Sequence, residues 1–312
     1  MSKVDSEIAV IVPVRNEEKT ILPLLESFER LTLLPKELVL VDGGSMDKTI
    51  ECITRYLEGR KLPYQICLLA LPEALPGRGR NEGIRKTECP LVACTDAGGT
   101  VDPRWLEELM TPMKSDDSCD MVIGNCRPDA KSFFERCTFY VYLGQGRRKE
   151  FAFSGGASVA FRKKLWSQVG GYPEALYPCE DKAFLEKVKK EKAHVFFSDG
   201  AFVYWRSRTT VREFFKQYFL YGRGDGEGGF VGHRYLARLL FYGALLILSI
   251  KGKYLMGLVT LAAYLAFLSV RGCLTLRAFR ALLILPFLFC IKDLAQLLGY
   301  GVGMARRYRE TD

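Results

Sequence analysis

Short apolar runs and amphipathic stretches alternate along the first half of the chain. The runs are rich in β-branched residues, which predicts buried strands over Ile8–Val14, Leu38–Val41, Tyr64–Leu69, Leu91–Thr95, Met121–Ile123 and Ser158–Phe161. Apolar residues at helical spacing predict helices over Glu17–Leu31, Asp47–Leu57, Gly77–Lys86, Trp105–Met113 and Asp181–Lys190. This alternation predicts an α/β fold with a mixed, mostly parallel sheet and helices on both faces.

The pattern changes near the end of the chain, where three long apolar stretches follow one another. They are Leu239–Ile250, Tyr254–Val270 and Ala281–Ile291, and the last continues beyond Lys292-Asp293 into Leu294–Met304. A spanning helix needs about 20 mostly apolar residues, so a small transmembrane bundle and helices lying in the interface are both open. We expect two or three helices to insert, and we divide the chain into a catalytic domain over 1–235 and membrane-associated helices over 236–312.

Charge is concentrated in the same apolar tail. The chain has a net charge of +9, and residues 236–312 carry ten Lys or Arg against three Asp or Glu. A basic, apolar tail favours a membrane with anionic lipids over nucleic acid, and no zinc-finger spacing or aromatic-interleaved basic run indicates DNA or RNA. Arg271, Arg277 and Arg280 predict that their loop, and with it the catalytic domain, is on the cytoplasmic side.

The ten cysteines are scattered without a Cys-x-x-Cys pair. The first residues, Met1–Asp5, are polar and lack the apolar core of a signal peptide. We therefore interpret the cysteines as free thiols in a reducing compartment. A structural zinc site is not expected, because His194 and His233 are the only histidines and neither lies at ligand spacing from a pair of cysteines.

Two predicted strands end in polar turns that suit ligand binding. The first strand runs into Pro13-Val14-Arg15-Asn16-Glu17, and the second into Asp42-Gly43-Gly44-Ser45 followed by Asp47 and Thr49. Open α/β sheets bind ligands at the carboxyl ends of their strands, and the glycines let a ligand approach the backbone. These turns are therefore the first candidate site.

Together the two turns resemble the opening of the family 2 glycosyltransferases, which have the GT-A fold. Pro13, Asn16 and Glu17 match the Pro-x-x-Asn-Glu segment of that family, and Asp42–Thr49 matches its Asp-(Asp or Gly)-Gly-Ser-x-Asp-x-Thr segment. A third match is Arg80-Asn81-x-Gly83, which lines the nucleotide site in the family. The resemblance implies that the nucleotide-sugar donor is bound by Pro13, Arg15, Glu17, Asp42, Gly43, Arg80, Asn81, Asp96 and Ala97.

The resemblance also implies a divalent cation, Mg²⁺ or Mn²⁺, at an Asp-x-Asp signature after a strand. Here the segment is Asp96-Ala97-Gly98, so only Asp96 remains as a metal ligand. One carboxylate can be enough, because Mg²⁺ keeps waters and binds substrate phosphates. Asp102 precedes Pro103, and helix capping is the favoured role for it. Many family members have a histidine where this chain has Tyr204-Trp205, a second departure at the expected metal site.

The catalytic pair of the family matches Glu180-Asp181, with Asp181 as general base and Glu180 as its helper. An inverting transfer needs a carboxylate that takes the proton of the acceptor hydroxyl. Gly155 and Gly156 match an acceptor-side turn that precedes Gly170-Gly171-Tyr172. Arg206, Arg208 and Arg223 are candidates for the diphosphate, since guanidinium groups suit phosphate oxygens.

The function implied is transfer of a sugar to a membrane-associated, lipid-linked or saccharide acceptor. A processive polymer synthase is not favoured, because Gln217-Tyr218-Phe219-Leu220 does not match the Gln-x-x-Arg-Trp motif. Two alternatives are a catalytically silent scaffold protein and a sugar nucleotidyltransferase; the retained Glu180-Asp181 argues against the first and the loop after the first strand against the second. Residues 129–153 fit either an acceptor loop or a helix on the sheet, and Tyr221–Gly226 is predicted to be a flexible loop.

Overall fold

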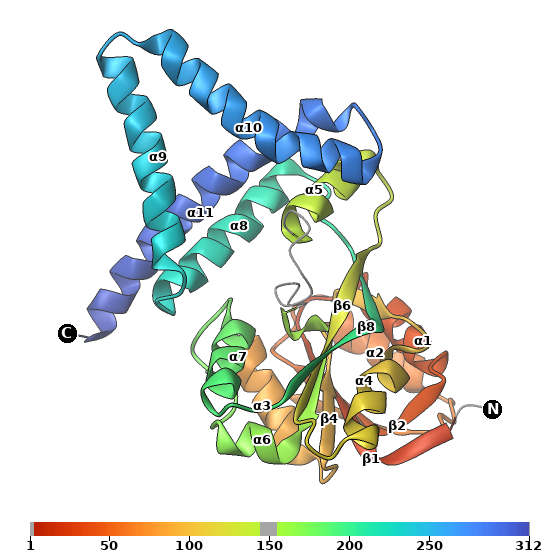
Figure 1. The fold of residues 1–312 in the computed structure, drawn as a ribbon. Coiled ribbons are helices and arrows are strands. Elements are labelled where there is room, and N and C mark those ends of the chain that lie inside the picture. Colours follow the sequence, from red (N-terminus) through yellow and green to blue (C-terminus); the bar gives the residue numbers. More distant parts are fainter. Residues whose placement is uncertain (1–2, 144–154, 312) are drawn as a thin grey trace. The chain divides into compact units, whose positions relative to one another are not determined.

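The computed structural model describes residues 3–143 and 155–311. The chain forms two compact units, Met1–Asp129 with Arg148–Arg206 and Ala130–Arg147 with Ser207–Asp312. The first is a sheet covered by helices and the second is helical (Figure 1). We call them the sheet unit and the helical unit. The helical unit contains the whole of the predicted segment 236–312, whereas the predicted domain boundary itself stays a prediction.

The sheet unit is built on eight strands in the order β3-β2-β1-β4-β7-β6-β8-β5. Strands β3, β2, β1 and β4 run parallel to one another, and β6 is parallel to β8. Strand β7 is antiparallel to both β4 and β6, and β5 is antiparallel to β8. The strands are β1 Lys3–Val14, β2 Leu33–Asp42, β3 Gln65–Ala70, β4 Leu91–Cys94, β5 Gly99–Val101, β6 Met121–Pro128, β7 Val159–Arg162 and β8 Val195–Trp205. The prediction of a mixed, mostly parallel α/β sheet is confirmed.

Helices cover both faces of this sheet because its central strands are apolar on both sides. In β1, Val10 and Val12 belong to one buried cluster, while Ala9 and Ile11 belong to the other. The first cluster includes residues of α1 and α4, and the second includes residues of α3, α6 and α7. The helices are α1 Ile21–Glu29, α2 Thr49–Leu57, α3 Pro76–Lys86, α4 Trp105–Ser115, α6 Lys163–Gln168 and α7 Glu180–Lys190.

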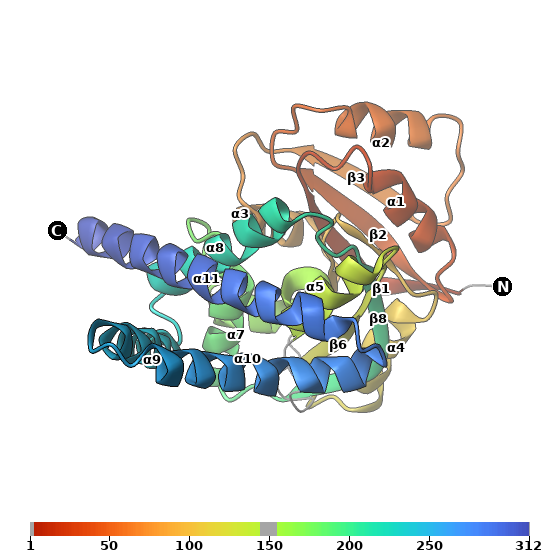
Figure 2. The same cartoon turned by 90° about the horizontal axis from the view of Figure 1, so that it is seen from above.

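The helical unit contains α5 Phe133–Leu143, α8 Val211–Glu227, α9 Gly232–Ile250, α10 Tyr254–Leu276 and α11 Ala281–Thr311. Its core joins α5, α8, α10 and α11 through residues such as Tyr140, Phe214, Cys273 and Leu285. Figure 2 shows α10 and α11 from above. Three helices, α9, α10 and α11, are long and apolar enough to cross a membrane. This confirms the expectation of long apolar helices in the tail, and their association with a membrane stays a prediction.

Two expectations about local structure need correction. The segment Tyr221–Gly226 was expected to be a flexible loop, but it continues α8 to Glu227. Its glycines pack against another helix, which the local sequence does not reveal. Part of residues 129–153 forms α5, whose buried side chains pack on helices of its own unit; residues 144–154 are outside the described part of the chain.

Candidate active site

The loops after β1 and β2 are joined by hydrogen bonds between their polar residues. The backbone N–H of Asn16 donates to Ser45 Oγ at 2.9 Å, and Asn16 Oδ1 accepts from the N–H of Met46 at 2.8 Å. The N–H of Glu17 donates to Thr49 Oγ1 at 2.7 Å. Helix α1 begins at Ile21 and not at the predicted Glu17, whose N–H is used in this contact. Residues that match the two family motifs therefore hold the two loops to each other; they are Asn16, Glu17, Ser45 and Thr49.

The predicted donor residues of these loops lie close together. The carboxylate of Asp42 is buried and accepts from the N–H groups of Gly44 and Ser45. A Cβ on Gly43 would lie 2.6 Å from the carbonyl oxygen of Ala74, so only glycine fits there. The same Cβ would lie 3.6 Å from Cδ of the exposed Arg15, which shows that Arg15 is adjacent. Asp42, Gly43 and Arg15 thus lie together at the strand ends, where Arg15 is exposed and the other two are buried. Their contact with a nucleotide stays a prediction.

Helix α3 packs closely because its glycines lack side chains. A Cβ on Gly79 would touch Pro13 Cβ at 3.4 Å, and one on Gly83 would lie 2.5 Å from Ile11 Cγ2. A Cβ on Gly77 would lie 2.4 Å from the carbonyl oxygen of Pro173 and 3.3 Å from Glu180 Cβ. The glycine-rich run therefore brings α3 against β1 and against the start of α7.

This close approach places Arg80 at the centre of the site. Its side chain is 2% exposed and bridges two carboxylates, with Nη2 2.5 Å from Asp96 Oδ1 and Nη1 2.6 Å from Glu180 Oε1. Its Nε–H is buried and has no hydrogen-bond partner among the described residues. Gly156 makes room for the guanidinium, since a Cβ there would lie 2.2 Å from Nη2. Arg80 therefore links the end of β4 to the start of α7.

Asp181 lies beside this bridge at the first turn of α7. Its Oδ1 accepts from the N–H of Lys182 at 2.7 Å. Burial and the neighbouring charge of Glu180 raise the pKa of Asp181 to about 6, although Arg80 opposes the shift. Glu180 is 6% exposed and paired with Arg80. Glu180 is thus held in an ion pair with Arg80, whereas the pKa of Asp181 suits a proton acceptor near neutral pH.

The Asp96 loop offers few protein ligands for a cation. Gly99 pairs with Trp205 across the β5–β8 ladder, so the two departures from the family pattern, at Gly98 and at Tyr204-Trp205, are close in space. Tyr204 donates from its hydroxyl to Asp102 Oδ2 at 2.9 Å. Within the described ranges, no three His, Cys, Asp or Glu residues gather as a metal site. Asp96, whose side chain is 26% exposed, is the remaining candidate ligand.

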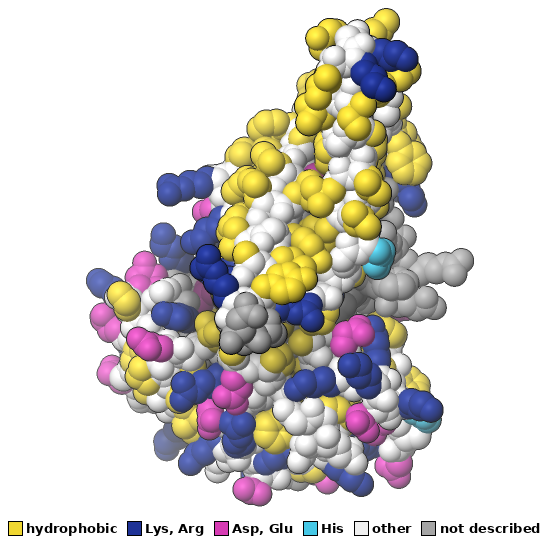
Figure 3. Space-filling view, turned by 90° about the vertical axis from the view of Figure 1, so that its left-hand side faces the viewer, with side chains coloured by type: hydrophobic (Ala, Val, Ile, Leu, Met, Phe, Trp, Pro, Cys, Tyr) yellow, Lys and Arg dark blue, Asp and Glu magenta, His cyan; other side chains and the backbone are white. Residues whose placement is uncertain are grey.

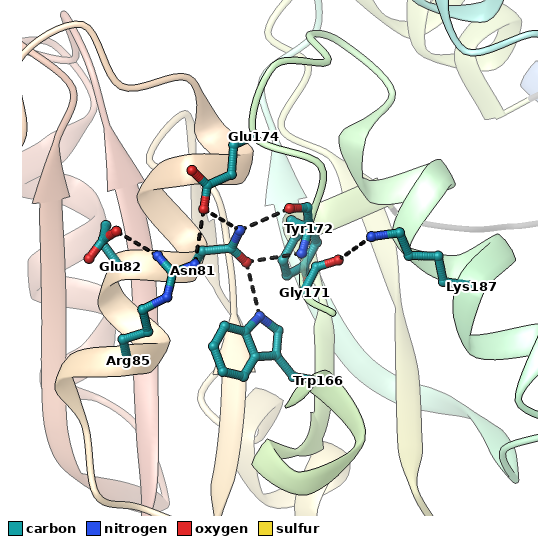
Figure 4. Close-up of polar contacts among 8 residues, drawn as sticks. All are labelled: Asn81, Glu82, Arg85, Trp166, Gly171, Tyr172, Glu174 and Lys187. Carbon is teal, nitrogen blue, oxygen red and sulfur yellow. Dashed lines mark hydrogen bonds and ion pairs between the residues drawn. The ribbon is translucent and has the colours of Figure 1, made fainter. Parts of the chain in front are cut away.

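The side chain of Asn81 is fully hydrogen-bonded within the protein, to Tyr172, Glu174 and Trp166 (Figure 4). Its Nδ2 donates to the carbonyl of Tyr172 at 2.8 Å and to Glu174 at 2.9 Å. Its Oδ1 accepts from the N–H of Tyr172 and from Nε1 of Trp166, both at 2.9 Å. These four bonds use the whole capacity of an amide side chain. The predicted contact of Asn81 with the nucleotide would have to replace one of these hydrogen bonds. In the structure, Asn81 holds the Gly171–Tyr172 turn.

Tyr172 is a site neighbour that the sequence analysis did not single out for chemistry. Its ring stacks on Phe184 with centroids 4.1 Å apart, and the Arg80 guanidinium carbon lies 5.4 Å from its centroid. Burial raises the pKa of its hydroxyl well above the usual value. The signal in the sequence was Gly170-Gly171-Tyr172, in which both glycines have positive φ.

The remaining predicted residues are divided between the two units. Ala97 is buried beside Asp96, and Gly155 opens a short 3-10 turn that ends at Ala157. Arg206 ends the sheet unit and is exposed. Arg208 and Arg223 belong to the helical unit, where Nε of Arg223 lies 3.4 Å from Glu227. Their predicted contacts with a diphosphate stay predictions.

Comparison with known proteins gives a consistent result. The family model described as glycosyl transferase family 2 matches residues 9–166. The chain is 25% identical over 237 residues to the succinoglycan biosynthesis protein ExoA of Rhizobium meliloti, covering 72% of this chain and 70% of that protein. It is 26% identical over 211 residues to the poly(ribitol-phosphate) beta-N-acetylglucosaminyltransferase TarS of Staphylococcus aureus, covering 65% of this chain but 36% of TarS.

Solved structures with the same fold have lower sequence identity. A mannosyltransferase from Pyrobaculum calidifontis, solved with GDP-Man and Mn²⁺, matches with a TM-score of 0.61 and 17% identity, over 93% of this chain and 87% of that one. Residues 1–349 of S. aureus TarS, in complex with UDP-GlcNAc, match with a TM-score of 0.52 and 17% identity, over 98% and 92% of the two chains. At these identities the likeness concerns the fold.

Proposed function

This chain belongs to glycosyl transferase family 2, and from that premise we propose that it is an inverting transferase that moves a sugar from a nucleoside diphosphate to an acceptor at the membrane. One observation carries the proposal. The buried guanidinium of Arg80 joins the carboxylates of Asp96 and Glu180, so that a partly exposed Asp96 and the raised-pKa Asp181 belong to one group.

In this proposal the donor lies over the strand ends. The nucleoside contacts the loops that follow β1 and β2, which are joined by hydrogen bonds. The contacting residues are Pro13, Arg15, Glu17, Asp42 and Gly43. The diphosphate follows toward Asp96 and Ala97, and exposed arginines such as Arg206 offset its charge. Arg80 and Asn81 support this surface from within, the first by neutralising buried carboxylates and the second by holding the Gly171–Tyr172 turn.

The transfer step uses Asp181 as the base. It takes the proton of the acceptor hydroxyl while the hydroxyl oxygen forms a bond to the anomeric carbon of the sugar. The bond between that carbon and the diphosphate oxygen breaks, and the diphosphate leaves with the bonding electrons. Because attack and departure occur on opposite sides of the carbon, the configuration inverts.

A divalent cation fits this site through Asp96, provided that donor phosphates and water supply the other ligands. When bound, such a cation supplies positive charge to the leaving diphosphate. Among the described residues, no three His, Cys, Asp or Glu side chains gather around Asp96. This arrangement predicts a modest dependence of nucleotide affinity on the cation.

The acceptor is proposed from the helices and the relatives. Three apolar helices favour an acceptor presented at the membrane, such as a lipid-linked saccharide. The basic residues Arg271, Arg277 and Arg280 favour the cytoplasmic side for the catalytic unit. TarS and ExoA are named for poly(ribitol-phosphate) and succinoglycan, which supports a saccharide or polyol phosphate as the acceptor class.

Replacing the base tests the proposal directly. Asp181→Asn should lower turnover about 10²–10⁴-fold, since this is the usual contribution of a general base, while nucleotide binding is retained. Donor hydrolysis or transfer measures turnover, and calorimetry with UDP and GDP, each with Mg²⁺ or EDTA, measures binding. The control is Glu186→Gln, an exposed change on the same helix. Unchanged turnover in Asp181→Asn would refute the role of Asp181.

A further inference from the structure

Helices α8 and α11 lie side by side with their backbones in contact. A Cβ on Gly222 would lie 2.3 Å from the carbonyl oxygen of Gln296, and one on Gly299 would lie 2.0 Å from that of Phe219. A Cβ on Gly303 would lie 2.1 Å from the carbonyl oxygen of Arg223. From the contact of Gly299 with Phe219 to that of Gly303 with Arg223, both sequence numbers rise by four, so the two helices run in the same direction (Figures 1 and 2). Because their backbones are in contact, α8 and α11 must lie at the same depth relative to a membrane.

Helix α8 is too polar to cross a bilayer. Charged residues occur along its whole length: Arg212, Glu213, Lys216, Arg223, Asp225 and Glu227. Charged side chains are rare at the centre of a membrane helix because burying a charge in hydrocarbon is costly. Helix α11 has a related problem, because Lys292 and the buried Asp293 fall near the middle of its apolar length. The pair therefore fits the membrane surface better than the membrane interior.

The other two apolar helices leave from opposite ends of this pair. Near the C-terminal end of α11, Tyr300 stacks on Tyr235 at the start of α9, with ring centroids 3.9 Å apart. Near its N-terminal end, Leu285 reaches within 2.2 Å of a Cβ built on Gly272, late in α10. Helices α9 and α10 meet at their other ends, at residues 251–253. They form a hairpin that projects from the pair (Figure 1).

The hairpin exposes large apolar side chains on both arms. They are Leu236, Leu239, Leu240, Leu246, Ile247, Ile250, Tyr254, Leu255, Met256, Leu258, Val259, Phe267, Val270 and Leu274. Figure 3 shows apolar side chains covering the projecting part and basic ones at its end. Its arms, of 19 and 23 residues, are about 28 and 35 Å long at 1.5 Å per residue. A hydrocarbon core about 30 Å thick matches this length.

We propose that the α9–α10 hairpin alone enters the bilayer, while α11 lies with α8 at its surface. The occupant of the exposed apolar surface is the lipid bilayer, as the length of the hairpin and the basic ends of both its arms indicate. The exposed apolar side chains of α11 are Leu283, Phe287, Leu294 and Leu298. They lie on a face of α11 other than the one whose Asp293 and Tyr300 meet the hairpin. The C-terminus is then on the same side of the membrane as the start of α8. Only two of the three helices that are long and apolar enough to cross a membrane do so. This inference rests on the membrane attachment in the proposed function.

Reporter fusions to the full chain test this arrangement. Green fluorescent protein, which fluoresces in the bacterial cytoplasm, and alkaline phosphatase, which is active in the periplasm, are fused in turn before Met1 and after Asp312. We expect both ends to give the same answer, with fluorescence and without phosphatase activity. Opposite answers at the two ends would mean three crossings and would overturn the inference while leaving membrane attachment intact.

Alkaline extraction of membranes separates the two possible failures. The wild-type chain should stay in the pellet; complete release would refute membrane attachment and this inference together. Leu246→Arg, on the hairpin, should lower the retained fraction several-fold, whereas Leu298→Arg, equally apolar and exposed but on α11, should change it little. Equal release by both substitutions would place α11 in the bilayer core and overturn the proposal.

Discussion

In the sheet unit, the buried ion pairs of Arg80 are open on one side. Arg80 has one N–H without a partner among the described residues, and Asp96, its partner, keeps 26% of its side chain exposed. Buried polar groups are normally paired, so this incomplete pairing needs a reason. A site that must admit a charged donor supplies one.

In the helical unit, the buried ion pair of Asp293 is closed in the sense that both of its carboxylate oxygens have partners, although Arg238 keeps 25% of its side chain exposed, much as Asp96 does. The Asp293 side chain is 2% exposed, and Oδ2 accepts from the hydroxyls of Tyr242 at 3.0 Å and Tyr264 at 2.9 Å. Nε of Arg238 lies 3.4 Å from Oδ1, and Arg238 also donates to Gln296 at 2.7 Å. The groups come from α9, α10 and α11 and hold those helices together. The comparison separates a buried charge whose oxygens all have partners from the Arg80 guanidinium, which leaves one N–H without a partner among the described residues and lies in the proposed ligand site.

The largest expected effect comes from removing the centre of the open pairs. Arg80→Met leaves Glu180 buried without its partner, which should cost about 3–5 kcal/mol of the free energy of unfolding. Urea denaturation followed by tryptophan fluorescence reports on the sheet unit, because all three tryptophans lie in it. The control is Arg85→Met on the same helix, whose side chain is 49% exposed and should cost about 0–1 kcal/mol. Similar costs for both would contradict the central position of Arg80.

The second largest effect is expected at the contact between α8 and α11, the helix that carries Asp293 of the closed pair. Gly299→Leu puts a side chain where the carbonyl of Phe219 lies and should cost about 1–3 kcal/mol, because α8 and α11 must separate. Thermal loss of helical circular dichroism in detergent measures the change. Gly301→Leu is the matched control, since a Cβ at Gly301 meets nothing within 4 Å. If Gly301→Leu destabilised the protein as much as Gly299→Leu, the packing described for α8 and α11 would be wrong.

A smaller effect is expected from pH at the open site. Since the pKa of Asp181 is raised to about 6, its carboxylate becomes protonated at a higher pH than a free Asp, whose pKa is about 4. A protonated base cannot accept the acceptor proton, so kcat/KM should fall about tenfold per pH unit below pH 6. Circular dichroism at each pH checks that the fold persists. An acid limb near pH 4 would show that Asp181 is not the titrating base.

The smallest effect is expected at the closed pair. Asp293→Asn keeps an oxygen for Tyr242 and Tyr264 but loses the charge opposite Arg238. Interhelical polar contacts in membrane proteins average about 0.6 kcal/mol, so the thermal midpoint in detergent should drop slightly and turnover should be unchanged. A loss of turnover comparable to that of Asp181→Asn would end the distinction between an open and a closed pair.

Much of the sheet unit was predictable because its signals are local. The β-branched run of β1 and the glycine turn after Asp42 define their elements within ten residues, and the sheet confirms both. The motif around Glu180-Asp181 also opens a helix, as expected. In the helical unit, the missed signal was the pair of Gly-x-x-x-Gly spacings, Gly222 with Gly226 and Gly299 with Gly303. Their meaning depends on a partner helix that is more than 70 residues away.

By itself, the sequence determined the alternation of strands and helices, the family motifs and the apolar tail, because periodicity and turn chemistry act between neighbouring residues. Only the tertiary structure decided which carboxylates share Arg80, why Asn81 is unavailable for other contacts and how α8 packs on α11. Those contacts join residues 16 to 100 positions apart, and they exist because glycines in α3, α8 and α11 allow elements to approach more closely than side chains would permit.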